Sequence, residues 1–168
     1  VLGTGDELVM PGVTPGPGQI VYSNGYGLRA LARAEGAEVV DLGIAADTVA
    51  ATAQGIRRAR EANADILITM GGASVGDHDL VKRSLEAEGT TMAFWRIAMR
   101  PGKPMMHGRL GGMRVIGLPG NPVSSYVCGF LFLVPLIRAL LGRDSINHPR
   151  ESAELGRDLA ANDQREDY

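Results

Sequence analysis

The chain has 168 residues, of which 45% are hydrophobic and 21% are charged, and its formal net charge is −2. A chain of this length can form one domain that folds without disulfides or metals. The small net charge argues against a protein whose main partner is a nucleic acid or a membrane surface. Cys128 is the single cysteine, so no disulfide can form within the chain, and we expect a packed thiol in a reducing, cytoplasmic compartment.

The first residues, VLGTGDEL, are typical of the end of a strand and the turn after it, so we expect the sequence to begin inside a domain. Residues 19–22 are the next strand candidate, and Ser23 or Asn24 can cap the helix that follows, which ends near Gly36. Residues 37–42 are predicted to form a short strand.

The middle of the chain continues this alternation. Asp47 occupies an N-cap position before an alanine-rich helix that reaches about Ala62 and keeps its arginines on the solvated face. Residues 66–69 are apolar and largely β-branched, which is typical of a central parallel strand. Asp79 caps the next predicted helix, which stops at Gly89.

The later part of the chain holds two more strand candidates, residues 90–99 and 111–118, and an apolar helix over residues 121–142. The longest uncharged run spans residues 115–137. Its GLPGNP segment and Pro135 are expected to leave too short a continuous helix to cross a bilayer, so we predict a buried core helix.

Strands and helices that alternate in this way predict an α/β domain over residues 1–142, with three layers and a mostly parallel sheet covered by helices on both faces. Residues 143–168 are polar and charged, which predicts a poorly ordered linker and the start of a further domain. In open parallel sheets ligands bind beyond the carboxyl ends of the strands. The turns after the predicted strands are therefore the candidate functional regions.

The turn GGASVGD follows the central strand and is rich in small residues. Gly71 and Gly72 let the backbone turn over an anion and direct N–H groups toward it, and Ser74 adds a hydroxyl donor. The motif lacks the lysine of a P-loop and the spacing of a dinucleotide fingerprint. Taken alone, the motif favours a tight turn that binds nothing.

Acidic side chains accompany these turns. Asp6 and Glu7 follow the first strand, Asp47 follows a later one, and Asp77 and Asp79 lie beside the glycine turn. Carboxylates next to a phosphate site repel the ligand unless a cation lies between them, and Mg²⁺ is the cation usually held in this way. Helix capping is the competing explanation for Asp47 and Asp79.

Basic side chains gather in WRIAMRPGKP, which supplies Arg96, Arg100 and Lys103. Strand alternation predicts that the two arginines share one face and that the following turn brings the lysine close to them. Guanidinium and ammonium groups both bind tetrahedral oxyanions. A solvated edge strand is the alternative interpretation.

The segment GLPGNPVSS joins a strand to a helix through two prolines. Gly120 and Asn121 precede the helix start and Ser124 follows it, so amide and hydroxyl donors are presented where a helix attracts anions. A strand that simply ends in proline, with a second proline opening the helix, explains the same pattern without a ligand.

Five motifs together resemble a known family. TGDEL, DLGIxxD, DILITxGGxSxGDxD, MRPGKP and GLPGNPVS occur in the order and approximate spacing of the molybdopterin molybdenumtransferases, which include the E domain of gephyrin. The resemblance covers about residues 1–142. It implies the molybdopterin-binding fold that this family shares with molybdopterin adenylyltransferase.

The resemblance implies an enzyme of molybdenum cofactor synthesis that binds adenylylated molybdopterin and molybdate, inserts the metal and releases AMP with the help of Mg²⁺. The implied catalytic residues are Glu7, Asp47, Asp79 and Lys103. The implied ligands of the cation are Asp47, Asp77 and Asp79. The implied substrate-binding residues are Gly71, Gly72, Ser74, Asp77, Arg96, Arg100, Gly120, Asn121 and Ser124. Positions 96 and 100 are often lysine in the family, so arginine keeps the charge there but changes its shape.

The same resemblance implies a homodimer for the full-length protein and the adenylyltransferase of the pathway as a protein partner, with no nucleic-acid or membrane partner. Two alternatives remain. One is adenylyl transfer to molybdopterin, which would consume ATP. The other is a module that binds the pterin without turnover.

Overall fold

The computed structural model describes residues 1–71, 80–154, 156–158 and 161–168. Within these residues the main sheet has six strands, in the order β4 (Ile44–Ala45), β1 (Leu2–Thr4), β5 (Ile66–Met70), β9 (Met113–Leu118), β8 (Met106–Leu110) and β6 (Thr91–Phe94). The strands β4, β1, β5 and β9 run parallel, whereas β8 is antiparallel to both of its neighbours. The predicted mostly parallel sheet is therefore confirmed.

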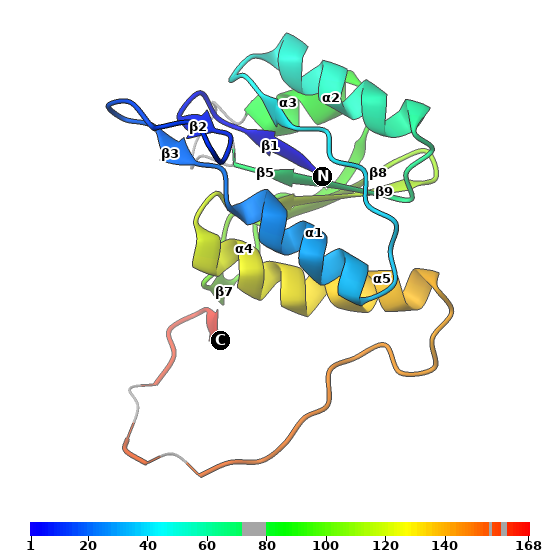
Figure 1. The fold of residues 1–168 in the computed structure, drawn as a ribbon. Coiled ribbons are helices and arrows are strands. Elements are labelled where there is room, and N and C mark those ends of the chain that lie inside the picture. The colour runs from blue at the N-terminus through cyan, green and yellow to red at the C-terminus, as the bar shows by residue number, and fades with distance from the viewer. Residues whose placement is uncertain (72–79, 155, 159–160) are drawn as a thin grey trace.

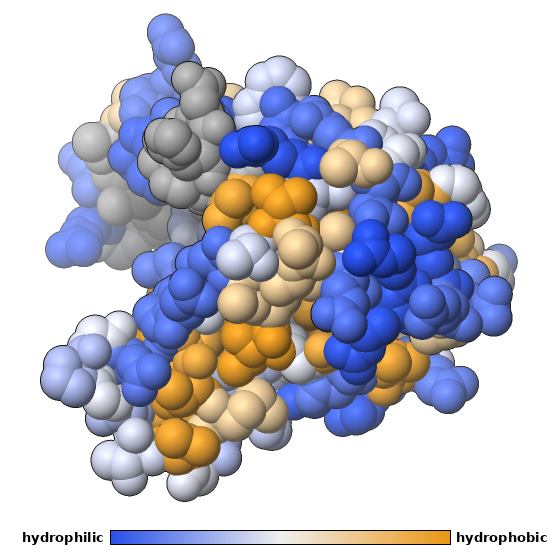
Figure 2. Space-filling view, turned by 90° about the horizontal axis from the view of Figure 1, so that it is seen from above, coloured by the Kyte–Doolittle hydropathy of each residue, from blue (hydrophilic) through white to orange (hydrophobic). Residues whose placement is uncertain are grey.

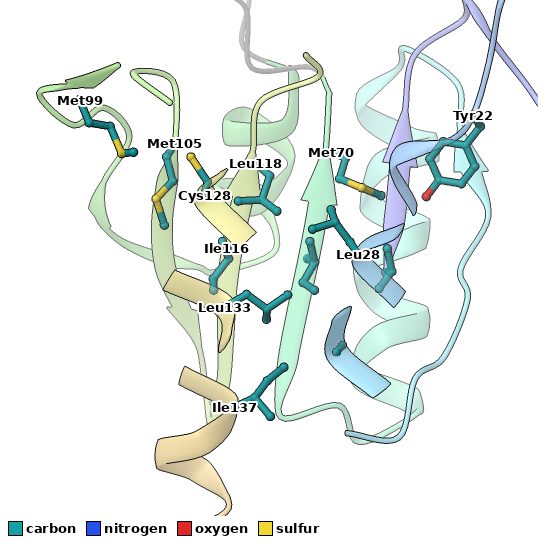
Figure 3. Close-up of a cluster of buried hydrophobic side chains, with 13 residues drawn as sticks. Tyr22, Leu28, Met70, Met99, Met105, Ile116, Leu118, Cys128, Leu133 and Ile137 are labelled. Atoms are coloured by element: carbon teal, nitrogen blue, oxygen red, sulfur yellow. The ribbon is translucent and has the colours of Figure 1, made fainter. Parts of the chain in front are cut away.

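Helices cover both faces of this sheet (Figure 1). One layer contains α2 (Val49–Glu61) and α3 (Leu80–Ala87), and the other contains α1 (Asn24–Ala34), α4 (Pro122–Cys128) and α5 (Val134–Leu140). Each layer buries its own apolar cluster against the sheet. Figure 3 shows the cluster between the sheet and the layer of α1, α4 and α5. It combines side chains of these helices and of the central strands: Leu28, Met70, Ile116, Leu118, Cys128, Leu133 and Ile137.

The outer surface of α2 is charged, as the sequence predicts. Arg57, Arg58, Arg60 and Glu61 are exposed, while Ile56 and Ala59 of the same helix are buried. Figure 2 views the molecule from the side of α2 and α3 and shows hydrophilic side chains over much of this face, with apolar areas at its centre and lower left. The helix thus packs one stripe on the sheet and exposes the other to water.

Two strand predictions need correction. Residues 37–43 contain no strand, although Val40 O and Leu42 N bond to Val1, and the ladder of β4 begins only at Ile44. In place of the predicted strand over residues 90–99 the structure has β6, which carries a bulge between Met92 and Phe94, and the two-residue β7 (Met99–Arg100).

Strand β8 was missed in the sequence. It forms a hairpin with β9 through Gly111 and Gly112, and the positive φ of 60° at Gly111 is one that glycine adopts easily. The Gly-Gly pair before the apolar run of β9 is a recognised hairpin signal and could have revealed β8, although His107 and Arg109 weaken the apolar pattern of β8 itself.

The long apolar helix continues past Pro135. A π-helical turn, η1 (Gly129–Leu133), joins α4 to α5, so the helical stretch Pro122–Leu140 is long and apolar enough to cross a membrane by length and composition. The predicted interruption was wrong, because a local π turn can rearrange the hydrogen bonding before a proline without ending the helix. Cys128, Leu133 and Ile137 are nevertheless buried against the sheet, as expected of a core helix.

Two short ribbons lie outside the main sheet. Strand β3 (Ile20–Val21), predicted within residues 19–22, pairs with β2 (Leu8–Val9). The segment after α5 is exposed and runs away from the domain before it returns, where β10 (Glu166–Asp167) pairs in parallel with β7 (Figure 1).

Candidate functional site

The carboxyl ends of β1, β4, β5 and β9 lie at one edge of the sheet because these strands are parallel. The chain also enters β8 at this edge, since Met106 of β8 pairs with Gly117 near the end of β9. We call this edge the carboxyl rim and define it by residues 5–7, 46–48, 71, 95–105 and 119–121. The predicted site residues that the structure describes all lie on the rim or, as Ser124 does, in the first turn of α4.

Two aspartates connect the turns after β1 and β4. The backbone N–H of Asp47 donates to Asp6 Oδ1 over 3.0 Å, and the N–H of Asp6 lies 3.4 Å from Asp47 Oδ2. Both residues are exposed, so each carboxylate keeps an oxygen available to a ligand. Asp6 was noted in the sequence but not assigned to the site, and its place in an acid-bearing turn was the available signal.

Asp47 does not cap α2, which corrects the sequence prediction. Thr48 is the N-cap, and its Oγ1 accepts from Ala51 N over 3.1 Å. Aspartate and threonine both serve well at this position. Here the threonine takes the role while Asp47 is engaged with Asp6 of the neighbouring turn, which leaves the Asp47 side chain at the rim.

Glu7 lies at the base of the same turn. A side chain added at Gly5 would place its Cβ 2.5 Å from Glu7 Oε2, so the glutamate folds back over this glycine. The φ of Gly5 is 147°, which other residues rarely adopt. Glu7 is thus fixed next to β1, but no hydrogen bond joins its side chain to Asp47 within the described residues.

Gly71 and Gly120 bring the turns after β5 and β9 together. A Cβ on Gly120 would lie 3.5 Å from the Cα of Gly71, and the N–H of Gly71 lies 3.4 Å from Leu118 O. Gly71 has a φ of 86°, and a Cβ there would lie 2.3 Å from Thr4 O. The backbone therefore passes close to β1 at a point where only glycine fits.

The start of α4 is capped by the predicted residues themselves. Asn121 Oδ1 accepts from Ser124 N over 3.2 Å and lies 3.5 Å from Ser124 Oγ. The structure therefore brings these two predicted site residues together and engages the asparagine oxygen in capping. Asn121 is exposed at the rim, and Ser124, in the first turn of α4, is partly buried.

Asn24 contacts the rim, and this contact was not predicted from the sequence. Its Nδ2 donates to Gly120 O over 2.7 Å, which ties α1 to the turn after β9. We expected Ser23 or Asn24 to cap α1 with its side chain, but the N-cap is Ser23, whose side chain makes no capping bond. A contact between residues 96 positions apart leaves no local signal in the sequence.

Arg96 and Lys103 lie on one side of the rim, before β8. Ile97 N donates to Lys103 O over 3.1 Å, so the segment that carries Arg96 is joined to the turn that carries Lys103. Within the described residues neither side chain makes an ion pair, and both are exposed. Both cations are therefore available to an anionic ligand.

Arg100 differs from these two cations. Its Nε donates to Asp167 Oδ1 over 2.9 Å, and its second terminal nitrogen bonds Asp167 Oδ2. This ion pair raises the pKa of Arg100 further above its usual range, mainly through the hydrogen bond to Asp167. The predicted shared face of Arg96 and Arg100 fails because residues 95–98 are not a strand and do not alternate.

Four predicted site residues lie outside the described residues: Gly72, Ser74, Asp77 and Asp79. Their assignments stay predictions. Among the residues that the structure does describe, no cluster of three acidic, histidine or cysteine side chains could hold a metal ion.

Cys128 is a packed thiol, as predicted. It is fully buried below the rim, and desolvation raises the pKa of its thiol to about 11. A Cβ on Gly102 would lie 2.6 Å from its sulfur, so the turn before β8 packs directly on it. This burial keeps the cysteine in its unreactive thiol form.

A cavity formed by described residues lies at the opposite edge of the sheet. It has a volume of about 320 Å³, and its lining includes Val1, Ile66, Leu133 and Leu140, at the amino ends of β1 and β5 and near the end of α5. This lining is largely apolar and carries none of the predicted site residues.

The fold and the rim define an α/β domain that presents glycine-containing turns, basic side chains and acids at one edge of its sheet. The sequence matches the family described as "Probable molybdopterin binding domain" over residues 1–139. Because this match covers most of the chain, the chain belongs to that family.

Relatives and solved structures agree with this assignment. The chain is 41% identical over 149 residues to a molybdopterin molybdenumtransferase of Haemophilus influenzae, covering 89% of this chain and 36% of the relative. It is 42% identical over 145 residues to one from Nostoc, covering 84% and 33%. A crystal structure titled as the molybdopterin biosynthesis MoeA protein of Pyrococcus horikosii has a TM-score of 0.77 at 34% identity and covers 86% of this chain and 35% of that one.

More distantly related proteins also have this fold. A MogA structure matches with a TM-score of 0.54 at 17% identity, covering 83% of this chain and 91% of that one, which shows a shared fold. The chain spans about a third of the length of the molybdenumtransferases it matches. The expected membership in the molybdopterin-binding family is therefore confirmed, and the place of the chain in molybdenum cofactor biosynthesis is supported.

Proposed function

We propose that this domain binds adenylylated molybdopterin and molybdate at the carboxyl rim and takes part in inserting molybdenum with release of AMP. The observation that carries the proposal is the convergence of the turns after β1, β4, β5 and β9 at one edge of a molybdopterin-binding fold. Relatives at 41% and 42% identity are named molybdopterin molybdenumtransferases. Their activity is the basis for the reaction proposed here.

The basic side of the rim suits the substrates. Molybdate, the pterin phosphate and the adenylyl group are all anions, and Lys103 and Arg96 are exposed cations without a described partner. The Gly71 N–H already donates to Leu118 O, so Lys103 and Arg96 are the donors proposed for phosphate oxygens. These groups would also stabilise the negative charge that develops as AMP leaves.

The acidic side of the rim suits a divalent cation. Mg²⁺ prefers oxygen ligands and is commonly held by one or two carboxylates together with phosphates and water. The Asp47 carboxylate, oriented by the Asp6 backbone, supplies such an oxygen, and Asp77 and Asp79 are the further ligands proposed. The bound ion would neutralise charge on the phosphoanhydride. Glu7 lies in the neighbouring turn, where it can orient water or the ion's hydration shell.

The proposal also includes the compartment, the oligomeric state and the partner enzyme of the full-length protein. We infer a cytoplasmic protein that works as a homodimer when full-length and that receives its adenylylated substrate from the adenylyltransferase of the pathway. The packed Cys128 thiol and the absence of a second cysteine are compatible with a reducing compartment.

The decisive assay measures AMP release from adenylylated molybdopterin by the 168-residue chain, with and without molybdate and Mg²⁺. Release that requires molybdate supports the proposal. Consumption of ATP with free molybdopterin would instead support adenylyl transfer. Binding of the pterin nucleotide with neither reaction would identify a binding module, and no binding would contradict the assignment of the rim.

A further inference from the structure

The end of the chain, residues 166–168, contacts the basic side of the rim. These residues lie outside the five sequence motifs. Strand β10 pairs in parallel with β7, so Asp167 lies beside Arg100, 67 positions away in the sequence. Glu166 N donates to Ala98 O over 2.9 Å, and Tyr168 N donates to Arg100 O over 3.0 Å. Backbone hydrogen bonds therefore fix Asp167 on both sides.

The ion pair uses only part of the arginine. Asp167 engages the Nε and one terminal nitrogen of Arg100, which is the two-point geometry that carboxylates form with a guanidinium. A guanidinium has five N–H donors in a fixed plane. The other terminal nitrogen keeps both of its N–H groups, and 52% of the Arg100 side chain is exposed.

We propose that Asp167 is a positioning residue for Arg100 and that β10 is therefore part of the anion-binding rim. The inference rests on the proposed function and deepens it, because it adds a residue from outside the predicted domain to the site. The ligand class is a tetrahedral oxyanion, either molybdate or a phosphate group of the adenylylated pterin.

The physical reason is preorganisation. A free arginine on a surface samples many rotamers, and a ligand must immobilise it at a cost in entropy. Asp167 holds the guanidinium in one plane before the ligand arrives. The carboxylate also offsets the positive charge of Arg100. If neutralisation were its only effect, removing the carboxylate would strengthen anion binding. If it orients the guanidinium, removing it weakens anion binding.

The test compares Asp167→Asn with wild type by titration calorimetry, with molybdate and AMP as separate probes at fixed ionic strength. We expect Asp167→Asn to weaken binding by about twofold to fivefold, which corresponds to the upper part of the range for exposed ion pairs. Glu151→Gln is the matched control, since it removes the same charge from the same segment without a described hydrogen bond or ion pair, and it should bind as wild type does.

A double-mutant cycle separates positioning from a general effect on the strand. In an Arg100→Gln background, Asp167→Asn should cause no further loss of affinity. An unchanged or tighter affinity in the single variant, or an equal loss in both backgrounds, would overturn the inference while leaving the proposed function intact. A wild-type chain that binds neither probe would overturn the proposed function itself.

Discussion

The parallel and antiparallel halves of the sheet contribute opposite charges to the carboxyl rim. The parallel half, β4, β1 and β5, presents Asp6, Glu7 and Asp47, and the hairpin side presents Arg96, Arg100 and Lys103. Gly71 and Gly120 meet between them. A ligand that carries both phosphates and a divalent cation fits such a division, because each end of the rim attracts one component.

The largest effect is expected where the two halves meet. Gly71→Val should destabilise the domain by about 2–4 kcal/mol, because a Cβ there collides with Thr4 O at a φ that valine rarely adopts. Urea denaturation measures the difference. Gly112→Ala is the control, since a Cβ at Gly112 meets nothing within 4 Å, and it should change stability little. Equal stability of all three proteins would contradict the close packing of the turns.

The acids of the parallel half should affect turnover more than substrate binding. Asp47→Asn keeps an oxygen that can accept from Asp6 N but loses the charge proposed to hold Mg²⁺, so AMP release should fall by about tenfold to a hundredfold. Single-turnover assays at saturating Mg²⁺ measure this rate. Asp65→Asn removes a carboxylate at the opposite edge of the sheet and should have no effect. An unchanged rate for Asp47→Asn would remove the acid from the mechanism.

The cations of the hairpin side should determine the affinity for anionic ligands. Lys103→Gln should weaken molybdate and AMP binding by about threefold to tenfold and make binding less sensitive to salt, because an exposed cation attracts anions through screened charge. Calorimetry at two ionic strengths measures both effects. Arg33→Gln, on the last turn of α1, is a charge-matched control. A comparable loss in that variant would show that net charge, not the rim, controls binding.

The smallest effect concerns the thiol below the rim. Burial raises the Cys128 pKa from 9.0 to about 11, so the folded state favours the neutral thiol. Its contribution to stability is present below pH 9 and is lost as the pH rises toward 11, because the unfolded chain ionises first. At pH 8 a thiol reagent should label the chain only after unfolding. Rapid labelling of the native protein would show that the turn before β8 opens.

Local patterns in the sequence were enough to predict the layers and the central strand. The apolar run at β5, followed by glycine, and the amphipathic pattern of α2 each determine their element within a few residues. The edge of the sheet was harder to predict. Strand β8 contains His107 and Arg109, so its apolar pattern is weak, and the bulge in β6 has no counterpart in composition.

Contacts between distant segments could not be predicted from one sequence. The bond from Asn24 to Gly120 and the pair of Arg100 with Asp167 join residues far apart in the chain, and β10 is too short to carry a strand pattern. The sequence predicted Asp47 as the cap of α2, whereas Thr48 takes this role and Asp47 bonds to Asp6 in the neighbouring turn. The turns that carry the candidate residues were thus predictable, but the hydrogen-bond partners of those residues were not.

A crystal structure of the chain with adenylylated molybdopterin, molybdate and Mg²⁺ would show where the substrates bind. We expect ligand density across the carboxyl rim, with the cation beside Asp47 and oxyanions beside Lys103 and Arg100. Density in the cavity at the amino ends of β1 and β5, with the rim left free, would contradict it.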